Sequence, residues 1–478
     1  MFFGGFFVDL AIIFLSLLGL MFFAYRGYSL IFIAPIFAVI AALSSDYASM
    51  PVYSELYMTK AAEYIKSYYP VFLLGAAFAK IMEEGGLAAS VAAKIVSVLG
   101  KERAVLAVLL GCGVLTYGGL SVFVVAFVMY PFAAILFKQA DIPKRLLPAI
   151  LWMGIFTYSM VSLPGTPQIQ NIIPAAVFGT TTWAGIGQGL LASILFFIIA
   201  YVWISYRSKK LKASGEGYGN HVLNEPENTD EALPDWRLSA IPLIMVILIN
   251  LYISNPFNWS WAFHWDQHSL EAFAPLNLTL IAPTVNKVQA IWSINAALIL
   301  SSIVAAFIGR KKLRHLGGVI HPINSGAIGS TSAVLNVASG YAFGCVIASL
   351  PAFAMIKTAL LGLSFGDGPL FSSIITTNIM VAITGSSSAG LMITVGTFGQ
   401  EWLTWAQQIG MSPELLHRII CISSEGFDTV PHAGALVTLM AVCGLTHKES
   451  YYDVFILTVI KFFVAFVCLA AYMLFGLV

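Results

Sequence analysis

Long apolar stretches, separated by short polar ones, run through the 478 residues of the chain. A helix needs roughly 17 to 25 apolar residues to cross a bilayer. Stretches of this kind cover 6–24, 29–45, 69–99 and 183–205 in the first half, and 238–254, 288–308, 338–363 and 453–477 in the second. The pattern therefore predicts an all-α polytopic membrane protein.

One apolar segment, 104–137, is too long for a single straight span. At about 1.5 Å per residue it would extend about 50 Å, and basic residues stand at both of its ends, at Arg103 and Lys138. Basic residues favour the cytoplasmic side of a membrane. We therefore expect this segment to fold back on itself as a re-entrant helical hairpin, and we expect a second hairpin at 373–400.

Two further apolar segments, 146–180 and 414–445, are interrupted by residues that break helices. The first contains Pro164, Gly165 and Pro167, and each proline removes a backbone donor and crowds the preceding turn. In hydrocarbon the freed backbone groups are costly, so they must face protein or a water-filled cavity. We predict two broken transmembrane helices, from which many secondary transporters build their substrate sites.

The two halves of the chain carry the same order of parts: three spans, a hairpin, a broken helix and a last span. We assign 1–206 to a first repeat, 207–237 to a polar linker and 238–478 to a second repeat. The basic residues of the linker predict that it is cytoplasmic and that both termini are extracytoplasmic. The halves then have opposite orientations, so the sequence predicts an inverted-topology repeat with a site near the bilayer midplane.

The composition excludes several classes of protein. Of all residues 59% are hydrophobic and 10% are charged, whereas an ordinary soluble domain has about 25% charged residues. The net charge of +1 gives no support for a nucleic-acid partner. The five cysteines lie in apolar stretches without the spacing of a metal site. We therefore expect neither a cofactor nor a bound metal.

Polar residues gather at the tips of the two hairpins and in the two breaks. Glycine lets the backbone approach a ligand, and free N–H groups at the start of a half-helix favour an anion. No arginine falls within the breaks, so these N–H groups would hold the anion. The alternative for each tract is that small residues only permit close helix packing. The candidate substrate-binding residues are Thr116, Tyr117, Gly118, Gly119, Gly165, Thr166, Gln168, Gln170, Asn171, Thr384, Ser386, Ser387, Ser388 and Ser424.

Three ionisable residues, Glu425, Asp428 and His432, stand together in the second broken helix. Ionisable groups at membrane depth are costly and mark functional sites. Asp428 and His432 are four residues apart, so a helical turn would let them pair, and histidine changes charge near neutral pH. We predict that the three couple transport to protons; the alternative is that they cap a hydrated helix end. Lys461 stands near a span end, where we expect its amine to reach the interface.

Four strings at these positions, LTYGG at 115–119, GTPQIQNIIP at 165–174, FDTVPH at 427–432 and GLTHKESY at 444–451, resemble the gluconate permease family of the ion transporter superfamily. The resemblance implies proton-coupled uptake of small hydroxy-carboxylates across a bacterial inner membrane. It also implies a homodimer whose transport domain moves against a scaffold as an elevator. Sugar-acid members have a His-Val-Asn-Asp-Ser-Gly-Phe-Trp pattern where this chain has Ser-Ser-Glu-Gly-Phe-Asp at 423–428, so the resemblance favours 3-hydroxybutyrate and short-chain hydroxy-carboxylate permeases.

Other functions remain open at this point. A sodium-coupled organic-anion symporter, a gluconate or sugar-acid permease and a passive channel are compatible with broken helices. An intramembrane enzyme using Asp428 and His432 would belong to a different class, but no GxSxG or HExxH motif accompanies these residues. The expected partners are a small organic anion, a proton or sodium ion, the lipid bilayer and a second copy of the chain.

Overall fold

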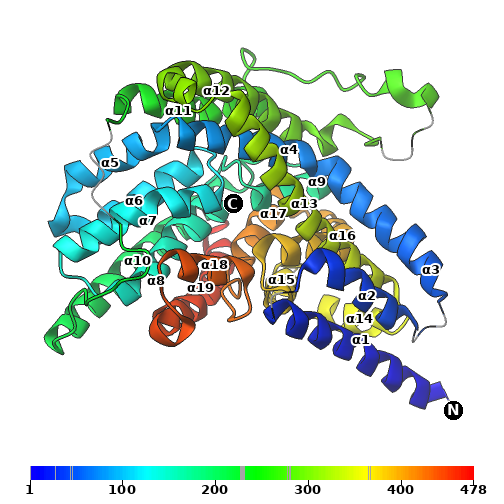
Figure 1. Cartoon of the computed structure of the whole chain (residues 1–478). Helices are drawn as coiled ribbons and strands as arrows, with labels where there is room; N and C mark the ends of the chain where they lie inside the picture. The colour runs from blue at the N-terminus through cyan, green and yellow to red at the C-terminus, as the bar shows by residue number, and fades with distance from the viewer. Residues whose placement is uncertain are drawn as a thin grey trace.

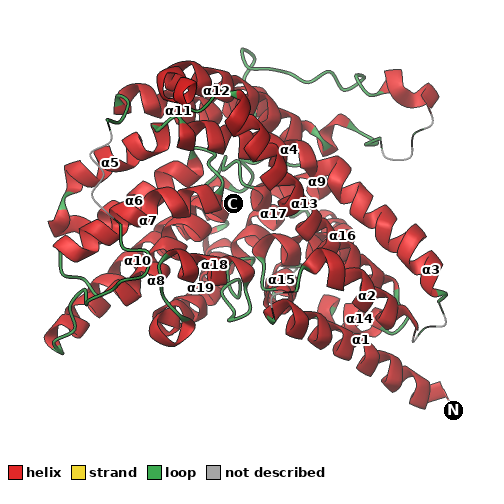
Figure 2. Cartoon of the chain, in the orientation of Figure 1, coloured by secondary structure: helices red, strands yellow, loops and turns green. Residues whose placement is uncertain are grey.

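The computed structural model of the chain describes every residue except 1, 27, 44, 46, 227–231, 277, 279–280, 364 and 367, and the side chains of 2–7 and 25 also lie outside the description. The described residues form helices and connecting loops (Figure 2). Seven described helices are long and apolar enough to cross a membrane. Many large apolar side chains on helices are exposed, such as Phe32, Phe307 and Phe463. The prediction of an all-α polytopic membrane protein is confirmed.

The helices follow the predicted order of parts (Figure 1). The first half contains α1 (Phe2–Tyr25), α2 (Leu30–Leu43), α3 (Ser49–Pro51), η1 (Val52–Tyr57), α4 (Met58–Glu84), α5 (Leu87–Leu99), η2 (Lys101–Arg103), α6 (Ala104–Tyr117), α7 (Val122–Gln139), η3 (Lys144–Leu146), α8 (Leu147–Trp152), η4 (Met153–Ser162), α9 (Ile169–Phe178) and α10 (Ile186–Ala213). The second half contains α11 (Trp236–Ser254), η5 (Glu271–Leu276), η6 (Val285–Lys287), α12 (Gln289–His315), α13 (Ile320–Ser349), α14 (Phe353–Leu361), α15 (Leu370–Thr384), α16 (Ser387–Gln408), α17 (Pro413–Ser423), α18 (Gly434–Val442) and α19 (His447–Phe475).

Two of the predicted spans have different bounds. The span expected at 69–99 is two helices, because α4 ends at Gly85 and Gly86 adopts a left-handed backbone with φ of 72° before α5. The span expected at 338–363 begins much earlier, at Ile320, and α14 is separated from α13 by a turn at Pro351. The first error arose because the span was drawn across Gly85 and Gly86, where the helix ends. The second arose because the small and polar residues at the start of α13 lower its apolar signal.

Both hairpins and both broken helices are present in the structure. The chain turns between α6 and α7 and again between α15 and α16, and each pair packs together. In the first broken helix, residues 163–168 separate η4 from α9; in the second, residues 424–433 separate α17 from α18. How deep the hairpins lie in a membrane stays a prediction.

The two halves interlock rather than pack as separate bodies. Helix α4 packs along α13, while α2 contacts α13 and α12 contacts α4, so each half supplies the same kind of contact to the other. Helix α9 of the first half packs against α16 and α17 of the second. The first broken helix is therefore held by the second hairpin and the second broken helix. Inversion of the halves in the bilayer stays a prediction.

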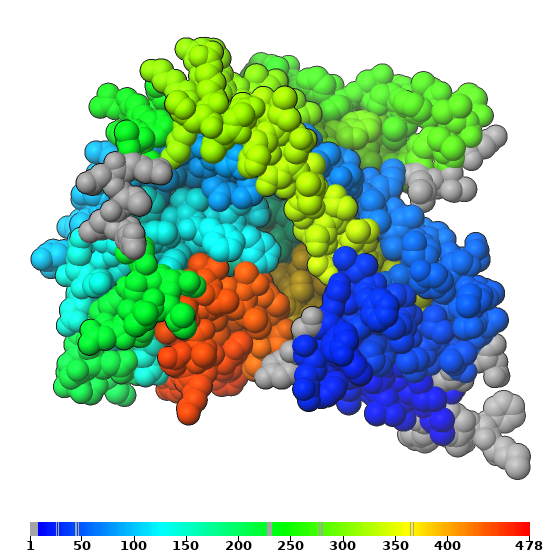
Figure 3. All heavy atoms as spheres, in the orientation of Figure 1, coloured from blue at the N-terminus to red at the C-terminus, as the bar shows by residue number. Residues whose placement is uncertain are grey.

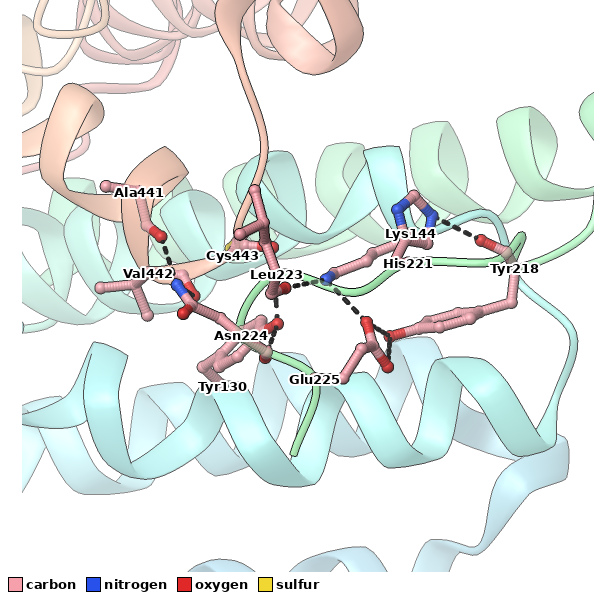
Figure 4. A network of polar contacts seen from close by, with 10 residues as sticks. All are labelled: Tyr130, Lys144, Tyr218, His221, Leu223, Asn224, Glu225, Ala441, Val442 and Cys443. Carbon is pink, nitrogen blue, oxygen red and sulfur yellow. Dashed lines mark hydrogen bonds and ion pairs between the residues drawn. The ribbon is translucent and has the colours of Figure 1, made fainter. Parts of the chain in front are cut away.

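The linker is helical at both ends, and residues 214–226 form an irregular segment that we name the strap. Residues 207–213 of the predicted linker continue α10, residues 227–231 lie outside the described residues, and 236–237 begin α11. The strap between them binds Lys144, which donates to Glu225 at 2.7 Å and to the carbonyl of Leu223 at 3.1 Å (Figure 4). Asn224 donates to the carbonyls of Ala441 and Val442 at the end of α18. The strap therefore ties the start of the first broken helix to the end of the second.

We expect Glu225→Gln to lower the unfolding free energy at pH 7 by about 1–2 kcal/mol, because it removes the carboxylate bound to the buried Lys144 ammonium. Burial raises the pKa of Glu225, but the hydrogen bond and charge of Lys144 and the Tyr218 hydroxyl outweigh burial, so the pKa lies below its usual value. A carboxyl with a lowered pKa stabilises the fold above its unfolded pKa of about 4.3 and loses this effect as the pH falls through the folded pKa.

Thermal unfolding of purified protein in detergent, recorded from neutral pH downwards, tests this expectation. The difference between the wild type and Glu225→Gln should shrink as the pH falls below about 4. The matched control is Glu216→Gln in the same strap, since Glu216 lies 3.6 Å from Arg145 and both side chains are substantially exposed. Equal losses in the two variants would contradict the role given to Lys144.

Candidate functional site at the broken helices

The first break is held open by a buried arginine from the second half. Arg418 on α17 donates to the carbonyls of Val161 at 2.9 Å, Thr182 at 3.1 Å and Ala184 at 2.8 Å. Its side chain is fully buried. Val161 lies just before the break, and Thr182 and Ala184 lie in the loop after α9, which folds back against the break. The Gly165 amide also donates to Thr182, so Arg418 adds a donor there and supplies one to Val161 and Ala184. The sequence analysis placed no arginine at the breaks, but Arg418 reaches into the first one from another helix.

Several predicted binding residues of the first half bind backbone within the protein. Gln168 donates to the carbonyls of Thr116 at 2.9 Å and of Leu120 at 3.0 Å, which joins the break to the tip of the first hairpin. Tyr117 donates from the same tip to the carbonyl of Pro164 at 2.7 Å. Gly118 and Gly119 form the turn of the tip. These residues shape the first break and the first hairpin tip together.

Thr166 and Asn171 brace the break from inside. Thr166 donates to the carbonyl of Ser159 at 2.8 Å, and Asn171 donates to the carbonyls of Thr166 at 2.9 Å and Thr182 at 2.7 Å. Gly165 has φ of 80° and lies against the ring of Trp183. The donors of Thr166, Gln168 and Asn171 are thus bound within the protein. The hydroxyl of Thr116 and the amide oxygen of Gln170, in contrast, are buried without a hydrogen-bond partner.

Serines of the second hairpin tip meet the second break. Ser387 and Ser424 share a hydrogen bond of 2.8 Å between their hydroxyls. Ser386 accepts from the amide of Ala389 and so caps α16, and its hydroxyl lies 3.3 Å from that of Ser388. Thr384 donates to the carbonyl of Ser386 at 3.1 Å. The start of α16 therefore faces the end of α17 with a cluster of hydroxyls.

The two breaks approach each other at the end of α17. Cys421 lies 3.4 Å from the carbonyl of Gln170 in the first half, and Ser424, one turn further along, holds Ser387. Residues one helical turn apart lie on the same face, about 5–6 Å from each other. The first break and the second hairpin tip are consequently neighbours on one face of α17. Figure 1 shows α9, α16 and α17 side by side near the centre of the molecule, in agreement with their contacts.

A cluster of three charged side chains adjoins this meeting point. Lys461 on α19 donates to Asp428 Oδ1 at 2.6 Å and lies 3.6 Å from Glu425 Oε2. All three side chains are at most 2% exposed. The prediction that Lys461 reaches the interface is wrong, because the helix turns its amine inward to two buried carboxylates. We name this group, Glu425, Asp428 and Lys461, the buried charge cluster.

His432 does not pair with Asp428 as the spacing suggested. The chain from 424 to 433 is not helical, so residues four apart do not share a face, and Asp428 is bound by Lys461 instead. The ring of His432 lies against Gly385 at the second hairpin tip, and its Nε2 is buried without a hydrogen-bond partner. A proton-coupling role for His432 stays a prediction.

Three further polar residues lie on the second hairpin and were not predicted as site residues. Thr376, Thr377 and Asn378 on α15 are buried, and the two hydroxyls and the Asn378 oxygen lack hydrogen-bond partners. Asn378 points its oxygen at Gly426 in the second break. The sequence does contain an indication of their role, because a helix that faces lipid would not carry three consecutive polar residues within an apolar span.

A recess reaches this region from one face of the molecule. In Figure 3 it separates the orange segment around α18 from the blue helices near the N-terminus, and gold-coloured residues of α15–α17 lie at its bottom. Pro431 in the second break is exposed and His432 is half-buried. The second break is therefore reachable from one side of the molecule, while the buried charge cluster behind it is closed off.

Comparison with known proteins identifies one extended sequence relative. The chain is 40% identical to the uncharacterized transporter YxjC of Bacillus subtilis (strain 168), over 98% of this chain and 100% of the relative. No family model matches the chain, and the resemblance to gluconate permeases stays a prediction.

Two solved structures are similar in fold. The YdaH transporter of Alcanivorax borkumensis has a TM-score of 0.56 at 14% identity, over 88% of each chain, which concerns the fold alone. MtrF of Neisseria gonorrhoeae has a TM-score of 0.49 at 14% identity, over 85% of this chain and 83% of MtrF.

Proposed function

Because the chain belongs to the family of the Bacillus subtilis transporter YxjC, we propose that it takes up a small hydroxy-monocarboxylate, such as 3-hydroxybutyrate, together with a proton. The observation that carries this proposal is the buried charge cluster beside the second break. Carboxylates enclosed at membrane depth are costly unless they are paired or take up protons. The cluster lies next to the hydroxyls of Ser387 and Ser424, so a proton site there would stand beside the proposed binding site.

The anion would bind where the two breaks meet. The start of α16 supplies free backbone N–H groups and the hydroxyls of Ser387 and Ser388, which favour a carboxylate. The amide of Gln170 and the hydroxyl of Thr116 would receive the remaining polar atoms, since both carry a buried oxygen without a partner. Thr376 and Thr377 on α15, whose buried hydroxyls also lack partners, would be further members of this lining. Backbone N–H groups and hydroxyls carry no net charge, so they would bind a small anion and still allow its release.

Alternating access would follow from movement of the hairpins and broken helices against the long crossing helices α4 and α13. The recess in Figure 3 would provide access from one side. An elevator motion, a homodimer and residence in a bacterial inner membrane with both termini extracytoplasmic belong to the same proposal. They rest on the resemblance to gluconate permeases and on the basic linker.

Uptake of labelled 3-hydroxybutyrate into proteoliposomes tests the proposal. With one proton per anion, a pH difference of one unit, acid outside, supports about tenfold accumulation. We expect Glu425→Gln to abolish this accumulation while exchange of labelled for unlabelled substrate continues, because the Asp428–Lys461 pair remains intact. Gluconate should compete weakly.

The matched control is Glu401→Gln, since Glu401 is an exposed acid on α16 that pairs with Lys357 far from the cluster. It should accumulate substrate like the wild type. Accumulation that ignores the pH difference, or that survives unchanged in Glu425→Gln, would refute proton coupling at this cluster.

A further inference from the structure

The buried charge cluster contains two carboxylates and only one cation. Glu425 and Asp428 lie on the second break, and Lys461 comes from α19 on the other side. The ammonium bonds to Asp428 at 2.6 Å, and it lies 5.8 Å from the centre of the Trp152 ring, whose face attracts a cation. Both oxygens of Glu425 and the second oxygen of Asp428 lack hydrogen-bond partners.

Among the residues that the structure describes, no second cation pairs with the cluster. Around Glu425 lie Asp428, Lys461 and the Ser387 hydroxyl, with Cys421 one turn back on α17; around Asp428 lie Lys461, Glu425 and Trp152. With both carboxylates ionised the cluster would hold one net negative charge in a medium of low dielectric, which is strongly unfavourable. One of the two carboxylates must therefore be protonated, or a further cation must bind beside it.

We propose that Lys461 is a built-in cation that fills, between the two carboxylates of a broken helix, a position that would otherwise attract a free monovalent cation such as sodium. Two carboxylates attract a cation, and backbone carbonyls freed at an unwound helix also suit a monovalent one. The remaining negative charge is balanced by a proton, which is taken up from water on one side by Glu425 and released from it on the other. Transport is then independent of sodium.

This inference rests on the proposed function for the proton, but its central claim concerns the cation position and is tested without any substrate. Lys461→Ala removes the ammonium and leaves two carboxylates facing a space, so sodium should bind there. The double variant Asp428→Asn with Lys461→Ala removes one charge of each sign and leaves too few charged oxygens to hold sodium. With Glu425 protonated, the double variant contains no unpaired buried charge in the cluster, so it should fold.

Thermal unfolding of the purified full chain in detergent, with sodium chloride exchanged for choline chloride at constant ionic strength, provides the measurement. The wild type should show no sodium-dependent change in its midpoint. Lys461→Ala should unfold at a lower temperature in choline and recover by roughly 3 °C or more in 100 mM sodium. The double variant should show no recovery.

The sodium dependence of the thermal midpoints tests the proposal directly. A sodium-dependent midpoint in the wild type, or folded Lys461→Ala that ignores sodium, overturns the proposal. If the alanine variant does not accumulate as folded protein, Lys461→Gln takes its place and the wild-type result still decides. Failure of proton-driven uptake would refute the proposed function yet leave the sodium result standing, so the two failures are distinguishable.

Discussion

Replacing Arg418 by alanine is expected to prevent the chain from accumulating as folded protein. The guanidinium is fully buried and donates to three carbonyls beside the first break. Each buried carbonyl left without a donor costs about 1–3 kcal/mol. The Thr182 carbonyl keeps the Gly165 amide and Asn171 as donors, so the carbonyls of Val161 and Ala184 lose theirs. These two losses, about 2–6 kcal/mol together, reach the range of the whole stability of a typical domain, about 5–15 kcal/mol. We therefore expect loss of the monodisperse species in detergent, measured by size-exclusion chromatography of the membrane extract.

The variant Arg418→Lys tests whether the positive charge alone is enough or whether the shape of the guanidinium is also needed. Arg418→Lys keeps the positive charge, but a single ammonium cannot reach three carbonyls that a planar guanidinium spans. It should fold with a lowered thermal midpoint. Lys209→Ala, a change of an exposed basic residue on α10, serves as the control and should leave the midpoint unchanged. A stable Arg418→Ala protein with the wild-type midpoint would show that the break does not depend on this residue.

Replacing Gly426 by alanine is expected to reduce uptake by at least tenfold. A Cβ at this position would lie 1.7 Å from the Asn378 oxygen and 2.8 Å from its Cγ. Because both residues are in a packed interior, the second break and the second hairpin would have to separate, and overpacking of this kind costs about 1–3 kcal/mol. The displaced segment carries Glu425 and Ser424, so the initial rate of uptake in proteoliposomes should fall together with the thermal midpoint.

The chain supplies both a control and a suppressor for this prediction. Gly434 ends the same break, and nothing lies within 4 Å of a Cβ built there, so Gly434→Ala should behave like the wild type. Asn378→Ala removes the three atoms nearest to the new Cβ and should restore folding in the Gly426→Ala background. An active Gly426→Ala protein, or a double variant as unstable as the single, would show that this contact does not determine the geometry of the break.

The sequence predicted the parts of the fold whose cause is local. Runs of apolar residues mark the helices, and Pro164, Gly165 and Pro167 interrupt the first broken helix wherever the rest of the chain lies. The turns of both hairpins were predicted within a few residues, because glycine and serine at the tips end one helix and cap the next. Bounds failed where a span contains polar or small residues that pack against another helix, as in α13.

The tertiary structure alone decided which charges meet. Arg418 binds carbonyls more than two hundred residues earlier in the chain. Lys461 on α19 binds Asp428, which lies 33 residues earlier in the second break. No spacing predicts such pairs, because the partner of a buried charge is set by how helices pack and not by the period of one helix. For the same reason the pairing of Asp428 with His432, inferred from their spacing, failed. In this chain the residues thus determine on their own where the helices break, whereas the packing of distant helices determines which buried groups compensate each break.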